Sequence, residues 1–79
     1  MKYLSEYLGV TIRQERERQK LSLRDVSEMA YISLGYLSEV ERGLKEVSSP
    51  VLNSIADALH VSLGDILTKT LSEVERETA

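Results

Sequence analysis

The apolar residues of the chain recur at intervals of three and four positions, the spacing that places side chains on one face of an α-helix. Five stretches with this spacing follow one another, and no stretch alternates apolar and polar residues over the length of a strand. We predict helices over about 3–20, 23–30, 34–42, 49–59 and 63–67, followed by a C-terminal helical extension over 68–79. The pattern therefore predicts an all-α fold of five helices with that extension.

Residues suited to helix ends support these boundaries. Serine, whose hydroxyl accepts a hydrogen bond from the free N–H groups of a first turn, precedes four of the helices, at positions 22, 33, 48 and 62. Asp25 follows the first of these serines by three residues and completes a near capping box, while Gly43 is expected to end the third helix. Gly9 lowers helix propensity by about 1 kcal/mol relative to alanine, so we expect the segment before it to fray.

The second and third predicted helices are short and are joined by a tight turn, which is the helix-turn-helix arrangement, over about residues 22–43. A third helix of ten residues is about 15 Å long, enough to lay its N-terminal half in a major groove. The side chains at the outward positions of its first turn are small or flat. A structural protein would usually place long charged side chains at such positions. We predict that the residues in contact with base edges are Ser33, Leu34, Gly35, Ser38 and Glu39.

These positions also have structural explanations. Ser33 caps the helix whether or not it touches DNA, and Leu34 contacts either the core or a thymine methyl group. Gly35 is either a weak point of the helix or a site of close approach. Glu39 is either a solvated side chain or a group that accepts from cytosine N4 or orients a nearby arginine.

Cationic and hydroxyl groups next to the third helix are candidates for phosphate contacts, which carry much of the affinity of a DNA-binding protein. The candidates are Arg24, Tyr36, Arg42 and Lys45. Each charged member could instead be an ordinary solvated side chain, and Tyr36 could instead pack at the edge of the domain.

The stretch SLGYLSEVERG over 33–43, with LSLRDVS over 21–27 and the apolar array after residue 52, resembles the lambda-repressor-like (Cro/XRE) helix-turn-helix family. The central stretch and the residues after it particularly resemble the Clp-gene regulator (ClgR) group of actinobacterial activators. The resemblance covers about residues 8–67. It implies a five-helix domain whose third helix enters the major groove, and a regulator that activates genes for Clp proteases and chaperones.

The resemblance also assigns structural roles. In this family an arginine of the first helix pairs with a glutamate near the end of the recognition helix, and the matching positions are Arg16 and Glu41. Two positions depart from the family pattern. Tyr31 stands where a turn glycine is usual, so the turn has either a positive φ at a steric cost or another shape. Ser27 stands where alanine is the usual small residue of the second helix.

The C-terminal segment carries an apolar stripe that a five-helix domain has nothing left to cover. Leu67, Leu71 and Val74 follow one another at helical spacing, and Lys69 is placed to pair with Glu73 beside them. We predict that residues 1–67 form the DNA-binding domain and that 68–79 pair two protomers, giving a homodimer on a palindromic operator. The alternative is a frayed, polar terminus.

Charge restricts where a DNA surface can lie. The net charge is −3, but residues 1–50 carry eight basic and eight acidic side chains, so the excess acid lies in the last third.

Two other functions remain open: an antitoxin or phage-type repressor of the same fold, and a protein-interaction module. Affinity that falls steeply with salt supports either DNA-binding function, whereas a flat salt response supports the interaction module. A protein partner such as RNA polymerase or a protease is also left open.

Composition narrows the functional class further. The 79 residues suit one domain with an aliphatic core, since the chain has no Phe or Trp. The absence of cysteine fits a cytoplasmic location without disulfides, and no apolar run is long enough for a membrane span. His60 has no ligand partners at metal spacing, and neither a catalytic triad nor a phosphate loop is recognisable. We therefore expect no enzyme activity, metal or cofactor.

Overall fold

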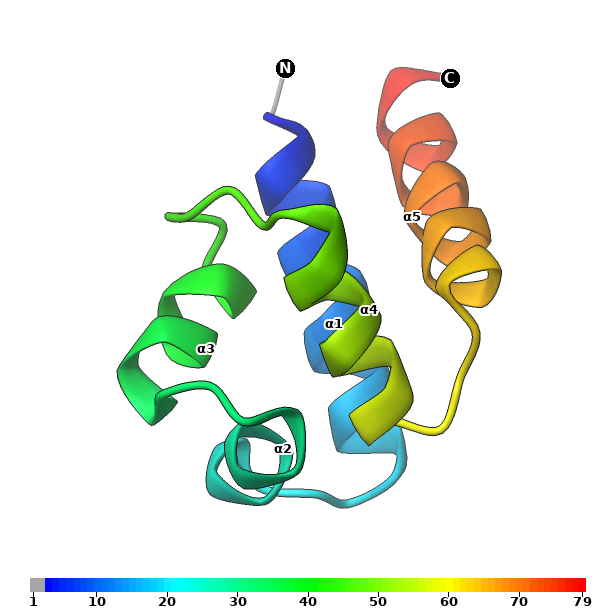
Figure 1. Ribbon diagram of the computed structural model, residues 1–79. Helices are drawn as coiled ribbons and strands as arrows, with labels where there is room; N and C mark the ends of the chain where they lie inside the picture. The colour runs from blue at the N-terminus through cyan, green and yellow to red at the C-terminus, as the bar shows by residue number, and fades with distance from the viewer. Residues whose placement is uncertain (1–2) are drawn as a thin grey trace.

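The computed structural model describes residues 3–79, which form five α-helices arranged as in Figure 1. Their bounds are α1 Leu4–Arg18, α2 Leu23–Ala30, α3 Leu34–Glu41, α4 Ser49–Ala58 and α5 Leu63–Thr78. No strand occurs within residues 3–79. The all-α fold is confirmed, and α1 and α4 run through the middle of the view between the α2–α3 pair and α5.

The serine caps hold the predicted helix starts. The backbone N–H of Asp25 donates to the hydroxyl of Ser22 over 2.9 Å, and the Asp25 carboxylate accepts from the backbone N–H of Ser22 over 2.8 Å. Ser62 and Asp65 form the same reciprocal pair at the start of α5. Ser33 and Ser48 each accept one backbone N–H at the starts of α3 and α4. Free N–H groups are thereby satisfied in the first turns of α2 to α5.

Each of the helices α1 to α4 is followed by a residue in the left-handed backbone conformation. Gly43 adopts a φ of 75°, and an added Cβ there would lie 2.7 Å from the Cα of Glu6, so glycine is required both by conformation and by space. Lys20, Tyr31 and His60 adopt φ angles of 59°, 58° and 57° although each carries a side chain. The turn between α2 and α3 therefore keeps the left-handed shape, with Tyr31 in place of glycine.

The core is aliphatic and is shared by all five helices. Its largest fully buried members are the branched side chains Ile12, Val26, Leu37, Val40, Ile55, Leu59 and Ile66. They include positions that the helical spacing placed on the inward faces of α2, α3 and α4. The inward side of α3 is therefore packed in the core, and its opposite side is left uncovered by the core residues.

Gly9 shows that one prediction was wrong. The segment before it does not fray, because α1 begins at Leu4 and Gly9 is buried within it. A Cβ at Gly9 would lie 2.5 Å from the carbonyl oxygen of Val40 and 2.6 Å from that of Glu41. The missing side chain lets α1 pass directly against the backbone at the end of α3.

α5 joins the predicted fifth helix and the predicted C-terminal helical extension into one helix. The boundary expected between residues 67 and 68 falls inside this helix, which continues without a break to Thr78. The side chain of Thr70 is buried against α1, with its hydroxyl 3.0 Å from that of Thr11. The C-terminal segment is therefore part of the packed domain along one side.

The expected pair between Lys69 and Glu73 was wrong. Lys69 Nζ instead lies 2.7 Å from a carboxylate oxygen of Glu15 on α1, and Glu73 pairs with Arg76 over 3.1 Å. Glu15 is almost fully buried although it stands in a highly charged stretch of sequence. A hydrogen bond from Arg18, followed by the bond and charge of Lys69, lowers the pKa of Glu15 against the opposing effect of its burial. This buried carboxylate helps to join α5 to α1.

Candidate nucleic-acid interface

The first turn of α3 presents small side chains and an exposed leucine. Ser33 is exposed, but its hydroxyl is turned back to accept the N–H of Tyr36 over 3.1 Å. Leu34 is 37% exposed, and Gly35 is exposed with no atom within 4 Å of the position of a Cβ. Ser38 and Glu39 are half-buried one turn further along. Residues three and four apart share a helix face, so Gly35, Ser38 and Glu39 lie together.

An ion pair fixes the far end of α3 on α1. The guanidinium of Arg16 donates through Nε and one terminal nitrogen to the two carboxylate oxygens of Glu41, over 2.7 and 3.0 Å. Its other terminal nitrogen donates to the carbonyl oxygen of Leu21 over 2.8 Å. The side chains of Arg16 and Glu41 are only 12% and 5% exposed. The hydrogen bond to Glu41 raises the pKa of Arg16, and the pair sets the orientation of α3 before any ligand arrives.

The cationic candidates come from three segments next to α3. Arg24 is exposed in the first turn of α2, and Arg42 is exposed at the C-cap of α3. Lys45 follows in the loop before α4, with its Nζ 4.0 Å from the carboxylate of Glu39. That separation is loose, and both side chains remain partly exposed, so the contact leaves Lys45 available to another anion.

Tyr36 is placed differently from the other phosphate candidates. Its ring is half-buried against the core, and its hydroxyl donates to the carbonyl oxygen of Glu46 over 3.4 Å. The side chain thus joins the loop after α3 to α3 itself. This geometry agrees with the packing role that the sequence left open for Tyr36.

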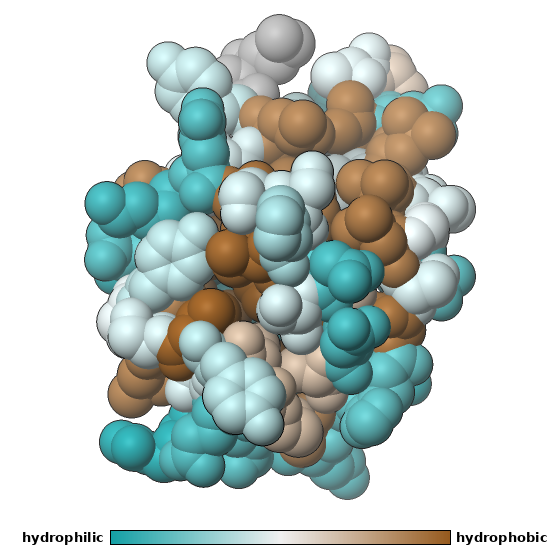
Figure 2. Space-filling view, in the orientation of Figure 1, coloured by the Kyte–Doolittle hydropathy of each residue, from teal (hydrophilic) through white to brown (hydrophobic). Residues whose placement is uncertain are grey.

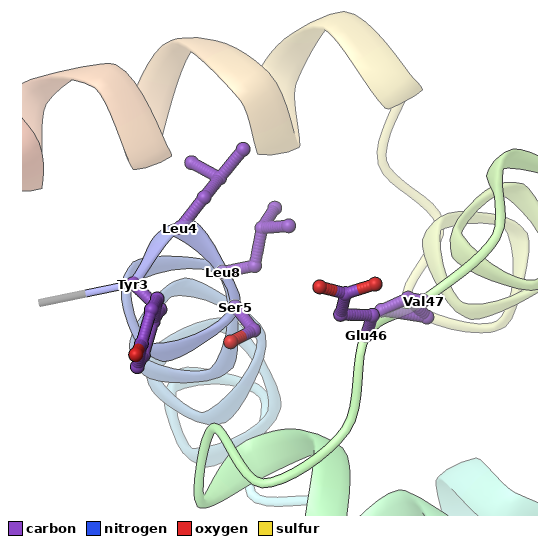
Figure 3. Close-up of a pocket in the computed structure, with 6 residues that line it drawn as sticks. All are labelled: Tyr3, Leu4, Ser5, Leu8, Glu46 and Val47. Atoms are coloured by element: carbon purple, nitrogen blue, oxygen red, sulfur yellow. The ribbon is translucent and has the colours of Figure 1, made fainter.

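A second candidate surface is apolar and involves α5. Leu67 and Leu71 are 50% and 56% exposed, and Val74 is half-buried on the same face. Figure 2 shows apolar side chains gathered in the upper part of the view, over α5 and the N-terminal part of α1. An open groove of about 390 Å³ lies at the N-terminal end of α1, lined by Leu4 and Leu8 of this helix and by Glu46 and Val47 of the loop between α3 and α4 (Figure 3).

Within residues 3–79, no three His, Cys, Asp or Glu side chains lie close enough together to hold a metal ion. None of the five helices described is long and apolar enough to cross a membrane.

Comparison with known proteins identifies the family. The profile described as helix-turn-helix matches residues 12–66. The transcriptional regulator ClgR of Mycobacterium tuberculosis is 43% identical over 72 residues, which cover 91% of this chain and 64% of the relative. The chain thus spans somewhat less than two thirds of that relative's length.

Solved structures agree with this match. The clp gene regulator ClgR from Corynebacterium glutamicum is 39% identical with a TM-score of 0.93, over 96% of this chain and 81% of the other. The restriction-modification controller protein C.AhdI from Aeromonas hydrophila has a TM-score of 0.77 at 24% identity, over 78% of this chain and 94% of the other, and shows a shared fold. The chain therefore belongs to the helix-turn-helix family, as its second and third helices predicted, and is similar to the ClgR regulators over most of its length.

Proposed function

We propose that this chain is a sequence-specific, double-stranded-DNA-binding transcriptional regulator whose α3 enters the major groove. The observation that carries the proposal is the combination of a small, exposed first turn on α3 with a buried Arg16–Glu41 pair at its far end. A recognition helix needs a face free of bulky charge and a rigid attachment to the rest of the domain. We also propose that the genes it activates encode Clp proteases and chaperones, because relatives at 39% and 43% identity are named clp gene regulators or ClgR.

In this proposal the two groups of candidate residues have different tasks. Leu34, Gly35, Ser38 and Glu39 meet base edges, and Arg24, Arg42 and Lys45 contact phosphates. The hydroxyls of Ser33 and Tyr36 already bond to the backbone of the chain, so these two residues have structural roles. Base contacts give sequence preference, whereas phosphate contacts give affinity that depends on salt but little on sequence. The two groups are therefore separable by experiment.

We expect two classes of variant: one that changes the sequence preference and one that lowers the affinity for every duplex. A duplex enriched by the wild-type chain from a random library serves as the cognate site. Ser38→Ala and Glu39→Ala should each cost about 1–3 kcal/mol at that site and relax the base preference, while leaving binding to random duplex nearly unchanged. Arg42→Ala and Lys45→Ala should weaken all duplexes alike and flatten the dependence of affinity on salt.

Arg13→Ala is the matched control, because this arginine is exposed on α1 and its partner among residues 3–79 is Glu17 of its own helix. It should bind both duplexes like the wild type. Equal losses on cognate and random duplexes for all four variants would contradict the assignment of base and phosphate contacts. A wild-type chain that enriches no sequence and shows no salt dependence would contradict the proposed function itself and would favour a protein-interaction module.

We further propose that two copies pair through the apolar face of α5 and bind a palindromic operator. A single domain of this size makes few phosphate contacts, and two copies one helical turn apart double the readout. Leu67 and Leu71 are exposed on a helix whose other side is packed on α1. An exposed apolar strip of this kind usually marks an interface.

Substitution of Leu67 and Leu71 by glutamine should abolish this pairing while the domain stays folded, because both side chains are already half exposed. Truncation after residue 67 is a poorer test, since it also removes Lys69 and Thr70, which contact α1. The double variant should sediment as a monomer and lose most of its operator affinity, with thermal stability near that of the wild type. Met29→Gln, on an exposed methionine of α2, should change neither property. A double variant that still sediments as a dimer would exclude this face as the interface.

A further inference from the structure

Of the four glycines in residues 3–79, Gly9 and Gly43 are required by the fold, whereas Gly35 and Gly64 are not. Gly9 and Gly43 are placed where a Cβ would meet backbone atoms at 2.5 to 2.7 Å. Gly35 lies in the right-handed helix α3, is exposed, and has no atom within 4 Å of a Cβ position. Glycine destabilises a helix relative to alanine, so the fold alone would favour a side chain here.

The surroundings of Gly35 form the least obstructed part of α3. Ser33, two residues before it, uses its hydroxyl to cap the helix and so does not reach outward freely. Ser38 and Glu39 follow one turn later on the same face and are half-buried. Backbone, rather than side chain, is therefore the outermost surface of the helix at Gly35.

We propose that Gly35 is a clearance site: the backbone of α3 lies in van der Waals contact with duplex DNA there, and any side chain holds the helix out of the groove. The inference rests on the proposed function. It deepens that function, because the lack of a side chain at Gly35 is what lets α3 come close enough to read the bases. A close-packed contact cannot admit an added methyl group without displacing one partner. Displacement of α3 would weaken every base contact that the helix makes.

The chain contains its own control for the effect of glycine on helix stability. Ser62-Leu63-Gly64 at the start of α5 repeats Ser33-Leu34-Gly35, and both glycines are the second residue of a serine-capped helix. A Cβ at Gly64 would meet only the Ser62 hydroxyl, at 3.7 Å, which is an ordinary contact. Alanine should therefore affect folding similarly at both positions, and only Gly35 lies on the recognition helix.

The test compares Gly35→Ala and Gly64→Ala in the full chain, using a duplex enriched from a random library by the wild-type protein. Both variants should melt at or above the temperature of the wild type. Gly35→Ala should bind the enriched duplex about tenfold more weakly, and Gly35→Leu more weakly still, whereas Gly64→Ala should bind like the wild type.

Each other outcome has a defined meaning. Binding by Gly35→Ala within about threefold of the wild type would overturn the clearance role while leaving the proposed function intact. Equal losses in Gly35→Ala and Gly64→Ala would also overturn it, because the effect would then belong to capped helix starts in general. A wild-type chain that binds no duplex would remove the proposed function and this inference together.

Discussion

Arg16→Ala is expected to lower the free energy of unfolding by about 3–5 kcal/mol, because it leaves the buried carboxylate of Glu41 without its partner. The two side chains form a bidentate pair, and Arg16 also satisfies the carbonyl oxygen of Leu21. Glu41→Ala should cost a similar amount by leaving the guanidinium unpaired. The whole stability of a small domain is about 5–15 kcal/mol, so either change should be evident in thermal or urea unfolding.

The control for this prediction is an exposed ion pair on the same helix. Nε of Arg13 lies 3.5 Å from a carboxylate oxygen of Glu17, and the two side chains are 61% and 55% exposed. Arg13→Ala should therefore lower the free energy of unfolding by about 0.5 kcal/mol or less. The double variant Arg16→Ala/Glu41→Ala should cost less than the sum of the two single changes, since no unpaired buried charge remains. Strictly additive losses would show that the two residues do not stabilise the domain as a pair.

Gly9→Ala is expected to destabilise the domain by about 3 kcal/mol, although alanine favours helices, because the added methyl group overlaps backbone oxygens. The two carbonyl oxygens involved, those of Val40 and Glu41, end α3 and cannot rotate away as a side chain could. α1 and α3 must therefore separate, and the resulting displacement of α3 should also reduce the proposed affinity for DNA. Urea unfolding measures the first effect and duplex binding the second.

Gly64→Ala provides the comparison, since its methyl group would meet only ordinary contact distances. It should retain or raise the stability of the wild type. If Gly9→Ala unfolded at the same urea concentration as Gly64→Ala, the close approach of α1 to α3 would be refuted.

The helix starts and most of the core were predictable because their causes are local. Serine caps at 22, 33, 48 and 62 satisfy N–H groups within three residues, and the buried positions of α4 follow directly from helical spacing. Leu37 and Val40, three residues apart, are likewise buried on one side of α3.

The errors concern contacts between residues far apart in sequence. Lys69 was expected to pair four residues away, but Glu15 offers a buried carboxylate that a helical pattern cannot reveal. Gly9 was interpreted from helix propensity alone, and its actual role depends on α3, which approaches from more than thirty residues away. The packing of the C-terminal segment on α1 was also missed, because Thr70 is a polar residue that is buried through its hydroxyl contact with Thr11.

The three side-chain-bearing residues with positive φ are positions at which the domain can gain stability by substitution. A left-handed conformation costs a residue with a Cβ about 1–2 kcal/mol, a cost that glycine does not carry. Lys20 and His60 lie in turns outside the recognition helix, so glycine at these positions offers stability without altering the surface proposed to meet DNA. With glycine at these two positions, the domain would hold a reserve of stability that offsets mildly destabilising substitutions on α3.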